Sequence, residues 1–404
     1  MWILWAGVLL CSSSYSMSVP FLPLFLFDLG VNEEGVNLWA GIVHSAAFLV
    51  GAIFAPLWGS LADQYGRKKM VIRAGLSLAV IYTLIAFVGN VWQLLAVRVL
   101  HGLAGGFVPA SMSVVAGVTP QQKMGWSLGM MQAGTMSGGI LGPLFGGLLA
   151  TWFGQRMSFV IAGVLMFIAT AAVIFWVHEG NTASPTKRTH IGQDLKFAFQ
   201  SKNLLKLLML LVVFQLSVNM IQPLMTLHIA DLSGTFEGAV LSSGFVLSII
   251  GIAGIVASPL WGRVGESRGY RNILVFCLFA SGLVAATQFF VGHLWVFTLI
   301  QCIYGFFLAG VMPSINTLVV RCTPDEFRGR SFGLTTSANQ IGGMLGPLIG
   351  GALGSLLSIH WIFVTVGAIL LAAGAAVLTR FRTMEQAPAM SGRTGHKNTS
   401  MENG

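Results

Sequence analysis

Two nearly identical stretches rich in glycine and proline lie inside apolar segments and limit what this chain can fold into. The first is Gly138-Gly-Ile-Leu-Gly142-Pro143-Leu-Phe-Gly146-Gly147, and the second, 204 positions later, is Gly342-Gly-Met-Leu-Gly346-Pro347-Leu-Ile-Gly350-Gly351. Such residues disfavour helices in water but are tolerated in lipid, where the backbone must bond internally and neighbouring helices support it. Glycines at i, i+4 and i+8 form a smooth stripe for close helix contact, and the proline bends the helix. Each copy therefore predicts a kinked, closely packed membrane helix.

The scarcity of charge supports a membrane environment for the whole chain. Of 404 residues, 55% are hydrophobic and 9% charged, whereas soluble domains carry about 25% charged residues. This composition excludes a soluble enzyme, and we interpret the net charge of +9 as a topology signal rather than nucleic-acid affinity. The four cysteines are far apart without metal-ligand spacing, so we expect no metal site.

Twelve apolar segments are long enough to span a bilayer. They are 2–27, 38–58, 70–90, 92–117, 126–150, 157–178, 204–230, 239–261, 272–292, 294–320, 331–357 and 360–381. With both termini in the cytoplasm, every basic residue except Arg98 and Arg156 falls in a cytoplasmic loop or tail, as positive charges prefer. The sequence thus predicts an all-α polytopic protein with twelve transmembrane helices.

The chain divides into two halves that repeat one another. Shifting the sequence by 203 positions aligns Pro56-Leu-Trp58-Gly59 with Pro259-Leu-Trp261-Gly262, and the Gly-Pro stretches align at 204. We therefore predict a six-helix bundle at 1–178, a cytoplasmic linker at 179–203, a second six-helix bundle at 204–382, and a disordered cytoplasmic tail at 383–404. Two parallel six-helix repeats are a transporter architecture, with the substrate path between the halves.

Four motifs resemble those of the major facilitator superfamily, and in particular its twelve-helix drug:proton antiporters. Between the second and third spans, Gly59-Ser-Leu-Ala-Asp63-Gln64-Tyr-Gly66-Arg67-Lys68 matches the family's loop signature except at Gln64. The fourth span carries Leu94-x3-Arg98-x2-His101-Gly102, with His101 where glutamine is common, and the first carries Pro20-Phe-Leu-Pro23. The Gly-Pro stretch of the fifth span matches the antiporter signature, and the eleventh span repeats it.

The resemblance implies a gating latch at the loop motif. Its residues are Gly59, Asp63, Gly66, Arg67 and Lys68, and in the family the Asp63 carboxylate would meet the N-terminus of the eleventh helix near 330–331. An anion at a helix N-terminus contributes roughly 0.3–1 kcal/mol when exposed. The alternative is a role in loop folding and topology only.

No Asp or Glu lies near the middle of any span, so the candidates for proton coupling must be sought among other residues and at the ends of the spans. We name three. Arg98 is the only fully charged residue deep in a span and must face protein or water. His101 shares its helix face and could carry a proton, although hydrogen-bonded packing is the simpler interpretation. Asp28 at the outer end of the first span is the nearest acid, unless it is a plain helix-end carboxylate.

By resemblance, the substrate cavity is lined by the first, fourth, seventh and tenth helices. Neutral amides, methionine and aromatic rings there suit bulky apolar molecules, unless they only bind helices to one another. The candidates are Tyr15, Phe21, Phe25, Gln215, Asn219, Gln222, Met225, Gln301, Tyr304 and Asn316.

The resemblance implies a proton-driven exporter of small apolar or amphipathic molecules, working by rocker-switch alternating access in a bacterial inner membrane. Such an antiporter confers multidrug efflux and antibiotic resistance, needs no cofactor, binds small-molecule substrates, protons and lipid but no nucleic acid, and is expected to be a monomer. The alternatives are a dedicated exporter of one metabolite or sugar and, more remotely, a membrane sensor on a transporter fold. No nucleotide-binding loop, metal cluster or nucleophile constellation indicates an enzyme.

Overall fold

The computed structural model describes residues 1–18, 21–119, 124–177, 200–234, 239–323 and 328–381, and these residues form helices without a strand. The helices of the first half are α1 (Trp2–Ser18), α2 (Leu22–Asp28), α3 (Glu33–Tyr65), α4 (Arg67–Ile85), α5 (Val91–Ala104), α6 (Phe107–Val118), α7 (Met124–Phe153) and α8 (Gln155–Trp176). The second half contains α10 (Lys202–Ile221), α11 (Met225–Ser233), α12 (Ala239–Arg268), α13 (Tyr270–Thr287), the short 3-10 helix η3 (Gln288–Phe290), α14 (Leu294–Leu308), α15 (Val311–Arg321), α16 (Arg328–Leu356) and α17 (His360–Arg380).

The predicted all-helical membrane fold is confirmed, and each of the twelve predicted segments coincides with one helix or with two consecutive helices. Within the described parts of the chain, nine helical segments are long and apolar enough to cross a membrane, or ten if α1 and α2 count as one span. The helices α4 and α16 are not among them. The first begins with Arg67-Lys-Lys and adds Arg73, and the second is rich in glycine.

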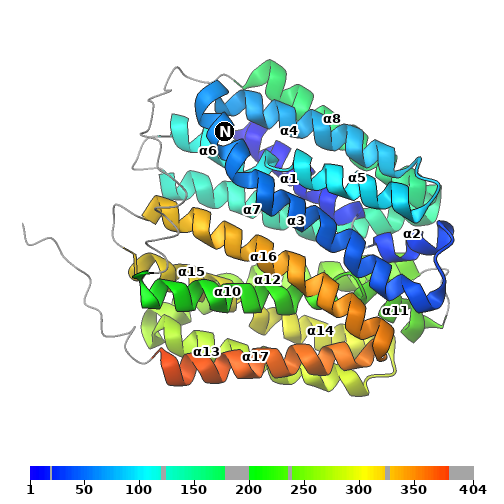
Figure 1. Ribbon diagram of the computed structural model, residues 1–404. Helices are drawn as coiled ribbons and strands as arrows, with labels where there is room; N and C mark the ends of the chain where they lie inside the picture. The colour runs from blue at the N-terminus through cyan, green and yellow to red at the C-terminus, as the bar shows by residue number, and fades with distance from the viewer. Residues whose placement is uncertain (19–20, 120–123, 178–199, 235–238, 324–327, 382–404) are drawn as a thin grey trace, which may run out of the picture.

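The helices form two bundles that lie side by side (Figure 1). One bundle contains α1 to α8 and the other α10 to α17, and they meet where α3 packs against α16 and α7 packs against α12. The short helices α2 and α11 lie together at one end of the molecule, which we call the α2–α11 end, and α6 and α15 lie toward the opposite end. The predicted linker and tail fall largely or wholly outside the described residues.

Equivalent hydrogen bonds show that the two bundles repeat one geometry. The Trp58 indole Nε1 donates to the Leu103 carbonyl over 2.8 Å, and the Trp261 Nε1 donates to the Phe306 carbonyl over the same distance. Both members of the second pair lie 203 positions after those of the first. The internal repeat seen in the sequence therefore extends to the contact between α3 and α5 and its counterpart between α12 and α14.

A second pair of equivalent hydrogen bonds joins the third span of each bundle to its last span. The Lys68 ammonium donates to the Ile174 carbonyl at 3.0 Å, and the Arg271 guanidinium donates to the Leu378 carbonyl at 2.8 Å. Both acceptors lie in the last turns of α8 and α17, where helix carbonyls carry partial negative charge and attract cations. The basic residues of the loop motif thus have partners inside their own bundle.

The glycine stripe of α7 lies against α1, as close packing predicts. A Cβ atom added at Gly138, Gly142 or Gly146 would collide with backbone or side-chain atoms of α1. The colliding backbone oxygens belong to Leu9, Ser13 and Met17. In the second bundle, Cβ atoms added at Gly342, Gly346 and Gly350 would meet carbonyls of α10. These carbonyls belong to Val212, Leu216 and Met220, which lie 203 positions after Leu9, Ser13 and Met17.

Replacing Gly142 by alanine tests this packing with a matched control on the same helix. We expect Gly142→Ala to lower the thermal unfolding temperature, because its Cβ overlaps Ser16 and the Ser13 carbonyl. Gly139→Ala should leave that temperature unchanged or raise it, because nothing described lies within 4 Å of its Cβ and alanine favours helix by up to about 1 kcal/mol. Differential scanning fluorimetry of purified protein measures both, and equal shifts would contradict the close packing.

Candidate functional site

The helices α7 and α16, which carry the Gly-Pro stretches, contact the opposite bundle as well as their own. Gly147 of α7 lies against Val240 and Leu241 of α12, and a Cβ atom at Gly244 would meet the Pro143 carbonyl oxygen. The same arrangement recurs between α16 and α3, where a Cβ atom at Gly41 would meet the Pro347 carbonyl and one at Gly351 would meet the Asn37 carbonyl at 2.6 Å. The backbones of the two bundles therefore approach each other directly at these two junctions, which we call the inter-bundle seams.

A serine hydrogen bond crosses each inter-bundle seam. The Ser45 hydroxyl of α3 donates to the Met344 carbonyl of α16, and the Ser248 hydroxyl of α12 donates to the Ile140 carbonyl of α7, both over 2.7 Å. These serines were not among the predicted site residues, although the shift of 203 positions aligns them. Each acceptor carbonyl lies three residues before the proline of its helix, and such a hydroxyl–carbonyl bond is a weak and replaceable contact, since these bonds between membrane helices contribute little energy.

The close contact of α3 with α16 begins at the α2–α11 end. There the Asn37 amide donates to the Gly354 carbonyl over 2.8 Å, and further along a Cβ atom at Gly51 would lie 3.0 Å from the Gln340 amide nitrogen. At Gly59, closer to the other end, no described atom lies within 4 Å of an added Cβ atom. The seams therefore hold the bundles together over the half of the molecule that carries α2 and α11.

Arg98 lies fully buried inside the first bundle, bonded to neutral groups. Its Nε donates to the Val43 carbonyl of α3 at 3.3 Å, and its Nη1 lies 2.9 Å from Nδ1 of His101 one turn along α5. The Tyr15 hydroxyl of α1 lies beside the guanidinium. The recorded partners thus include no carboxylate, and the positive charge is stabilised by dipoles and hydrogen bonds.

The hydrogen bond from Arg98 determines the state of His101. A guanidinium can only donate, so Nδ1 must accept and the imidazole must be neutral with its proton on Nε2. The rings of Tyr15 and Tyr82 contact this imidazole edge-on, with centroids 5.8 and 5.3 Å away. A second proton on His101 would break the bond and place two cations together in a buried site.

The second bundle has neutral residues at the equivalent positions. Gln301 replaces Arg98 and Tyr304 replaces His101, and both are buried on α14. The Gln301 amide nitrogen lies 3.1 Å from the Gln288 oxygen and 3.5 Å from the Met225 sulfur. The repeated fold therefore carries a buried charge in one bundle and a neutral amide pair in the other.

Comparison with known proteins agrees with this duplicated helical architecture. The sequence profile of the Major Facilitator Superfamily matches residues 4–254 and again 207–401. The chain belongs to the Major Facilitator Superfamily. It is therefore a multi-pass membrane protein of a transporter family, as the four motifs indicated.

Similar members of the superfamily include bacterial multidrug proteins. The chain is 33% identical to "Multidrug resistance protein MdtG" of Proteus mirabilis (strain HI4320) over 372 residues, which cover 92% of each protein. It is 34% identical to the MdtG protein of Salmonella dublin over 371 residues, covering 91% of this chain and 92% of the relative. The motifs of the first, fourth and fifth spans led us to expect an exporter of this kind.

Solved transporters share the fold at lower identity. The nucleoside transporter NupG aligns with a TM-score of 0.79 at 14% identity, covering 93% of this chain and 98% of NupG. A bacterial homolog of the human lysosomal transporter Spinster, in an inward-facing and occupied conformation, also gives 0.79 at 14% identity, with coverages of 96% and 98%. These alignments support the fold and carry no information on the substrate.

The structure describes part of the predicted latch of this superfamily member. The Asp63 side chain and those of 328–333 lie outside the described residues, so the proposed contact of Asp63 with α16 stays a prediction. Gly66 joins α3 to α4 with φ 102° and ψ 138°, a conformation that favours glycine, and Gly269 adopts φ 85° at the equivalent position. Arg67 donates to the Ser113 carbonyl of α6 at 2.9 Å, which fixes this turn against its own bundle.

The coupling candidates fall into two separate places. Arg98 and His101 form one buried cluster in the first bundle, as their shared helix face predicted. Asp28 ends α2 and is exposed at the α2–α11 end. Any role of these residues in proton coupling stays a prediction.

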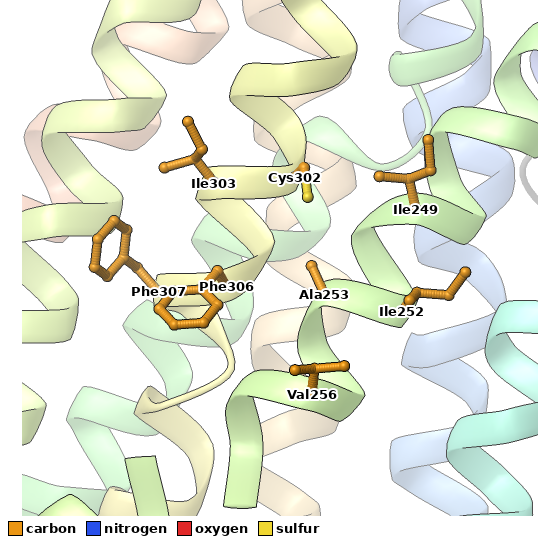
Figure 2. A pocket seen from close by; sticks show the side chains of 8 residues that line it. All are labelled: Ile249, Ile252, Ala253, Val256, Cys302, Ile303, Phe306 and Phe307. Atoms are coloured by element: carbon orange, nitrogen blue, oxygen red, sulfur yellow. The ribbon is translucent and has the colours of Figure 1, made fainter. Parts of the chain in front are cut away.

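The cavity candidates are dispersed over both bundles, and none of them lines the apolar pocket between α12 and α14 that Figure 2 shows. Phe21 and Phe25 are fully buried, and Phe25 packs edge-on against Phe159. Asn219 faces the glycine stripe of α16 at Gly346 and donates to the Gln215 carbonyl. Met225, Gln301 and Tyr304 are buried, whereas Tyr15, Gln215, Gln222 and Asn316 are half-buried. As substrate ligands, all ten remain predictions.

Exchanging Arg98 for the residue of the other bundle tests whether its charge is needed. Arg98→Gln copies Gln301 and removes a buried charge that costs about 2.5–3.5 kcal/mol to insert. We expect normal membrane insertion but a transport rate at least about tenfold lower, because charge-assisted hydrogen bonds worth about 1.5–3 kcal/mol are lost.

The matched variant Arg98→Lys keeps the charge but not the forked geometry that reaches both Val43 and His101. Its transport rate should fall between those of the wild type and Arg98→Gln. Efflux from cells is measured beside the amount of protein in the membrane. Wild-type efflux by Arg98→Gln would show that transport does not need the charge.

Proposed function

We propose that this chain is a secondary active exporter that removes several unrelated apolar or amphipathic molecules from the cytoplasm. The similarity to MdtG proteins, at one third identity over more than nine tenths of the chain, carries this proposal. The neutral and aromatic character of the cavity candidates supports it, because such side chains accept varied apolar ligands. The protein would act as a monomer in a bacterial inner membrane with both termini cytoplasmic, as the distribution of basic residues predicts.

The inter-bundle seams support a rocker-switch mechanism. Glycine backbones in contact, with a serine hydrogen bond crossing each seam, form an interface that can part and re-form as the bundles tilt, since such hydrogen bonds contribute little energy. The described contacts concentrate at the α2–α11 end, which is the outer end in the predicted orientation. The structure would then correspond to a state closed to the outside, and tilting would exchange this contact for one at the other end.

Inward proton flow would drive the cycle, with Arg98 and His101 as the coupling pair. In the described state the imidazole is neutral and accepts from the guanidinium. A proton arriving at His101 would release Arg98 from this bond, and repulsion between the two cations would favour rearrangement. No exogenous cofactor takes part.

One observation favours a second function, the export of a single metabolite or sugar. Arg98 is a buried cation whose partners among the described residues are neutral, so an anionic or strongly polar substrate would find an unpaired positive charge there. Breadth of substrates separates the two functions.

Efflux in a host stripped of its own exporters tests the proposed function. We expect cells expressing the protein to accumulate less of several unrelated fluorescent or radiolabelled drugs than cells with the empty vector. A protonophore should abolish the difference, since the gradient supplies the energy. Efflux that persists after the gradient collapses would contradict proton coupling, and efflux of one compound alone would favour the dedicated exporter.

A reversible cross-link across one seam tests alternating access. A Cβ atom at Gly354 would lie 3.5 Å from the Cβ atom of Asn37, which is within the range of disulfides. In a background in which the four native cysteines are replaced, we expect the pair Asn37→Cys and Gly354→Cys to stop efflux when oxidised. Reduction should restore it.

A pair inside one bundle provides the control. A Cβ atom at Gly374 of α17 would lie 3.4 Å from the Leu278 Cβ atom of α13, so Leu278→Cys with Gly374→Cys should also form a disulfide. Because both helices belong to the second bundle, oxidation should leave efflux unchanged. Undiminished efflux with the Asn37–Gly354 link verified by mass spectrometry would disprove tilting at this seam.

A further inference from the structure

Three metal-ligating side chains meet at the α2–α11 end of the second bundle. His228 and Asp231 lie one turn apart on α11, and His360 begins α17. One ligand atom from each of them lies within 4.8 Å of the other two. The cysteine spacing had predicted no metal site, and these three residues gave no signal in the sequence, since 129 or more positions separate His360 from the others and only folding brings them together.

His228 of α11 is fully buried. Neither ring nitrogen has a hydrogen-bond partner among the described residues. The rings of Phe297, Phe363 and His360 surround the imidazole, with centroids 4.9, 4.9 and 5.0 Å away. Burial of an imidazole without a partner is unfavourable, and buried polar groups are nearly always bonded. A bound ion or molecule between His228, Asp231 and His360 would give the His228 ring nitrogens the partner that they lack.

A cavity of about 530 Å³ reaches two members of this cluster, Asp231 and His360, whereas the buried His228 does not line it. Asp231 and His360 line it from the second bundle, and Glu33 and Asn37 line it from α3 of the first bundle. Two carboxylates therefore face one cavity in a chain whose net charge is +9. The cavity favours a small cation over an anion.

We propose that His228, Asp231 and His360 form a binding site for a divalent transition-metal ion, with Zn²⁺ as the best match. Two imidazoles and a carboxylate are ligands that Zn²⁺ prefers, and three protein ligands leave a fourth position for water from the cavity. Tetrahedral ligands about 2.0–2.1 Å from the metal lie roughly 3.4 Å from one another. The cluster must contract from its widest separation, which rotation of the exposed Asp231 and the half-buried His360 permits.

The aromatic surroundings fit a metal site with one fixed and two movable ligands. The rings around His228 hold its imidazole in place before binding. His360 also contacts Phe289 edge-on, with centroids 6.4 Å apart. The site is distinct from Arg98, which lies in the other bundle, and its occupation does not depend on the proposed drug export.

Metal titration of the purified full chain without a polyhistidine tag tests the site. After removal of metals with a chelator, Co²⁺ should bind one ion per chain with the visible absorption of a tetrahedral site, and Zn²⁺ should displace it. Asp231→Asn and His360→Phe keep the shape of the two accessible ligands and should each lower the affinity at least about tenfold. Zn²⁺ should raise the thermal unfolding temperature of the wild type more than that of either variant.

Two exposed residues provide controls. His293 precedes α14 and Glu34 lies in the first turn of α3, so His293→Ala and Glu34→Gln should bind the metal as the wild type does. Because the two ligand variants change exposed and half-buried positions, they should fold even if a His228 variant does not. Equal affinity of the wild type, Asp231→Asn and His360→Phe, or the absence of stoichiometric binding, would overturn the proposal.

Discussion

Direct contact between helix backbones at glycine is the interaction on which this structure depends. In a bilayer, lipid tails are as apolar as leucine, so burial of apolar side chains does little to hold helices together. Association must come from close packing, which increases when a Cα atom touches a neighbouring carbonyl. The helix α7 makes such contacts on two faces, with α1 through Gly138, Gly142 and Gly146 and with α12 through Gly147. One helix thereby connects the core of its own bundle to the opposite bundle.

The duplicated fold carries unequal chemistry. Backbone contacts, the indole bonds of Trp58 and Trp261, and the serine bonds of both seams follow the repeat closely. The polar interiors do not, since Arg98 in one bundle corresponds to Gln301 in the other. Symmetry is thus retained where helices must pack and is lost at this buried polar position, where the same fold carries a charged side chain in one bundle and a neutral one in the other.

Much of the fold could be predicted from the sequence because the periodic features are local. Apolar length, the shift of 203 positions and the glycine spacing indicated the helices, the duplication and the stripe that faces α1. The second contact face, through Gly147 and Gly351, could not be predicted, since spacing within one helix does not show which neighbour each side meets. The predicted segment 92–117 is broken at Gly106, where φ is 110°. The pair Gly105-Gly106 indicated this break, but the continuous apolar pattern around it favoured one unbroken helix.

The functional groups were less predictable, because their partners come from distant parts of the chain. The identity of Arg98 showed that it needs partners but not that the Val43 carbonyl is one of them. His101 was predictable as a neighbour through its position at i+3. The cluster of His228, Asp231 and His360 was not, since an i, i+3 pair on one helix is common and the third ligand comes from the last helix.

The bonds from Lys68 to Ile174 and from Arg271 to Leu378 have a mechanical consequence. Each joins the start of a bundle's third span to the end of its last one, so these two spans are tied together at one end of each bundle. In the proposed tilting motion, the two tied spans would move together with their own bundle. The rearrangement would then fall on the contacts between the bundles.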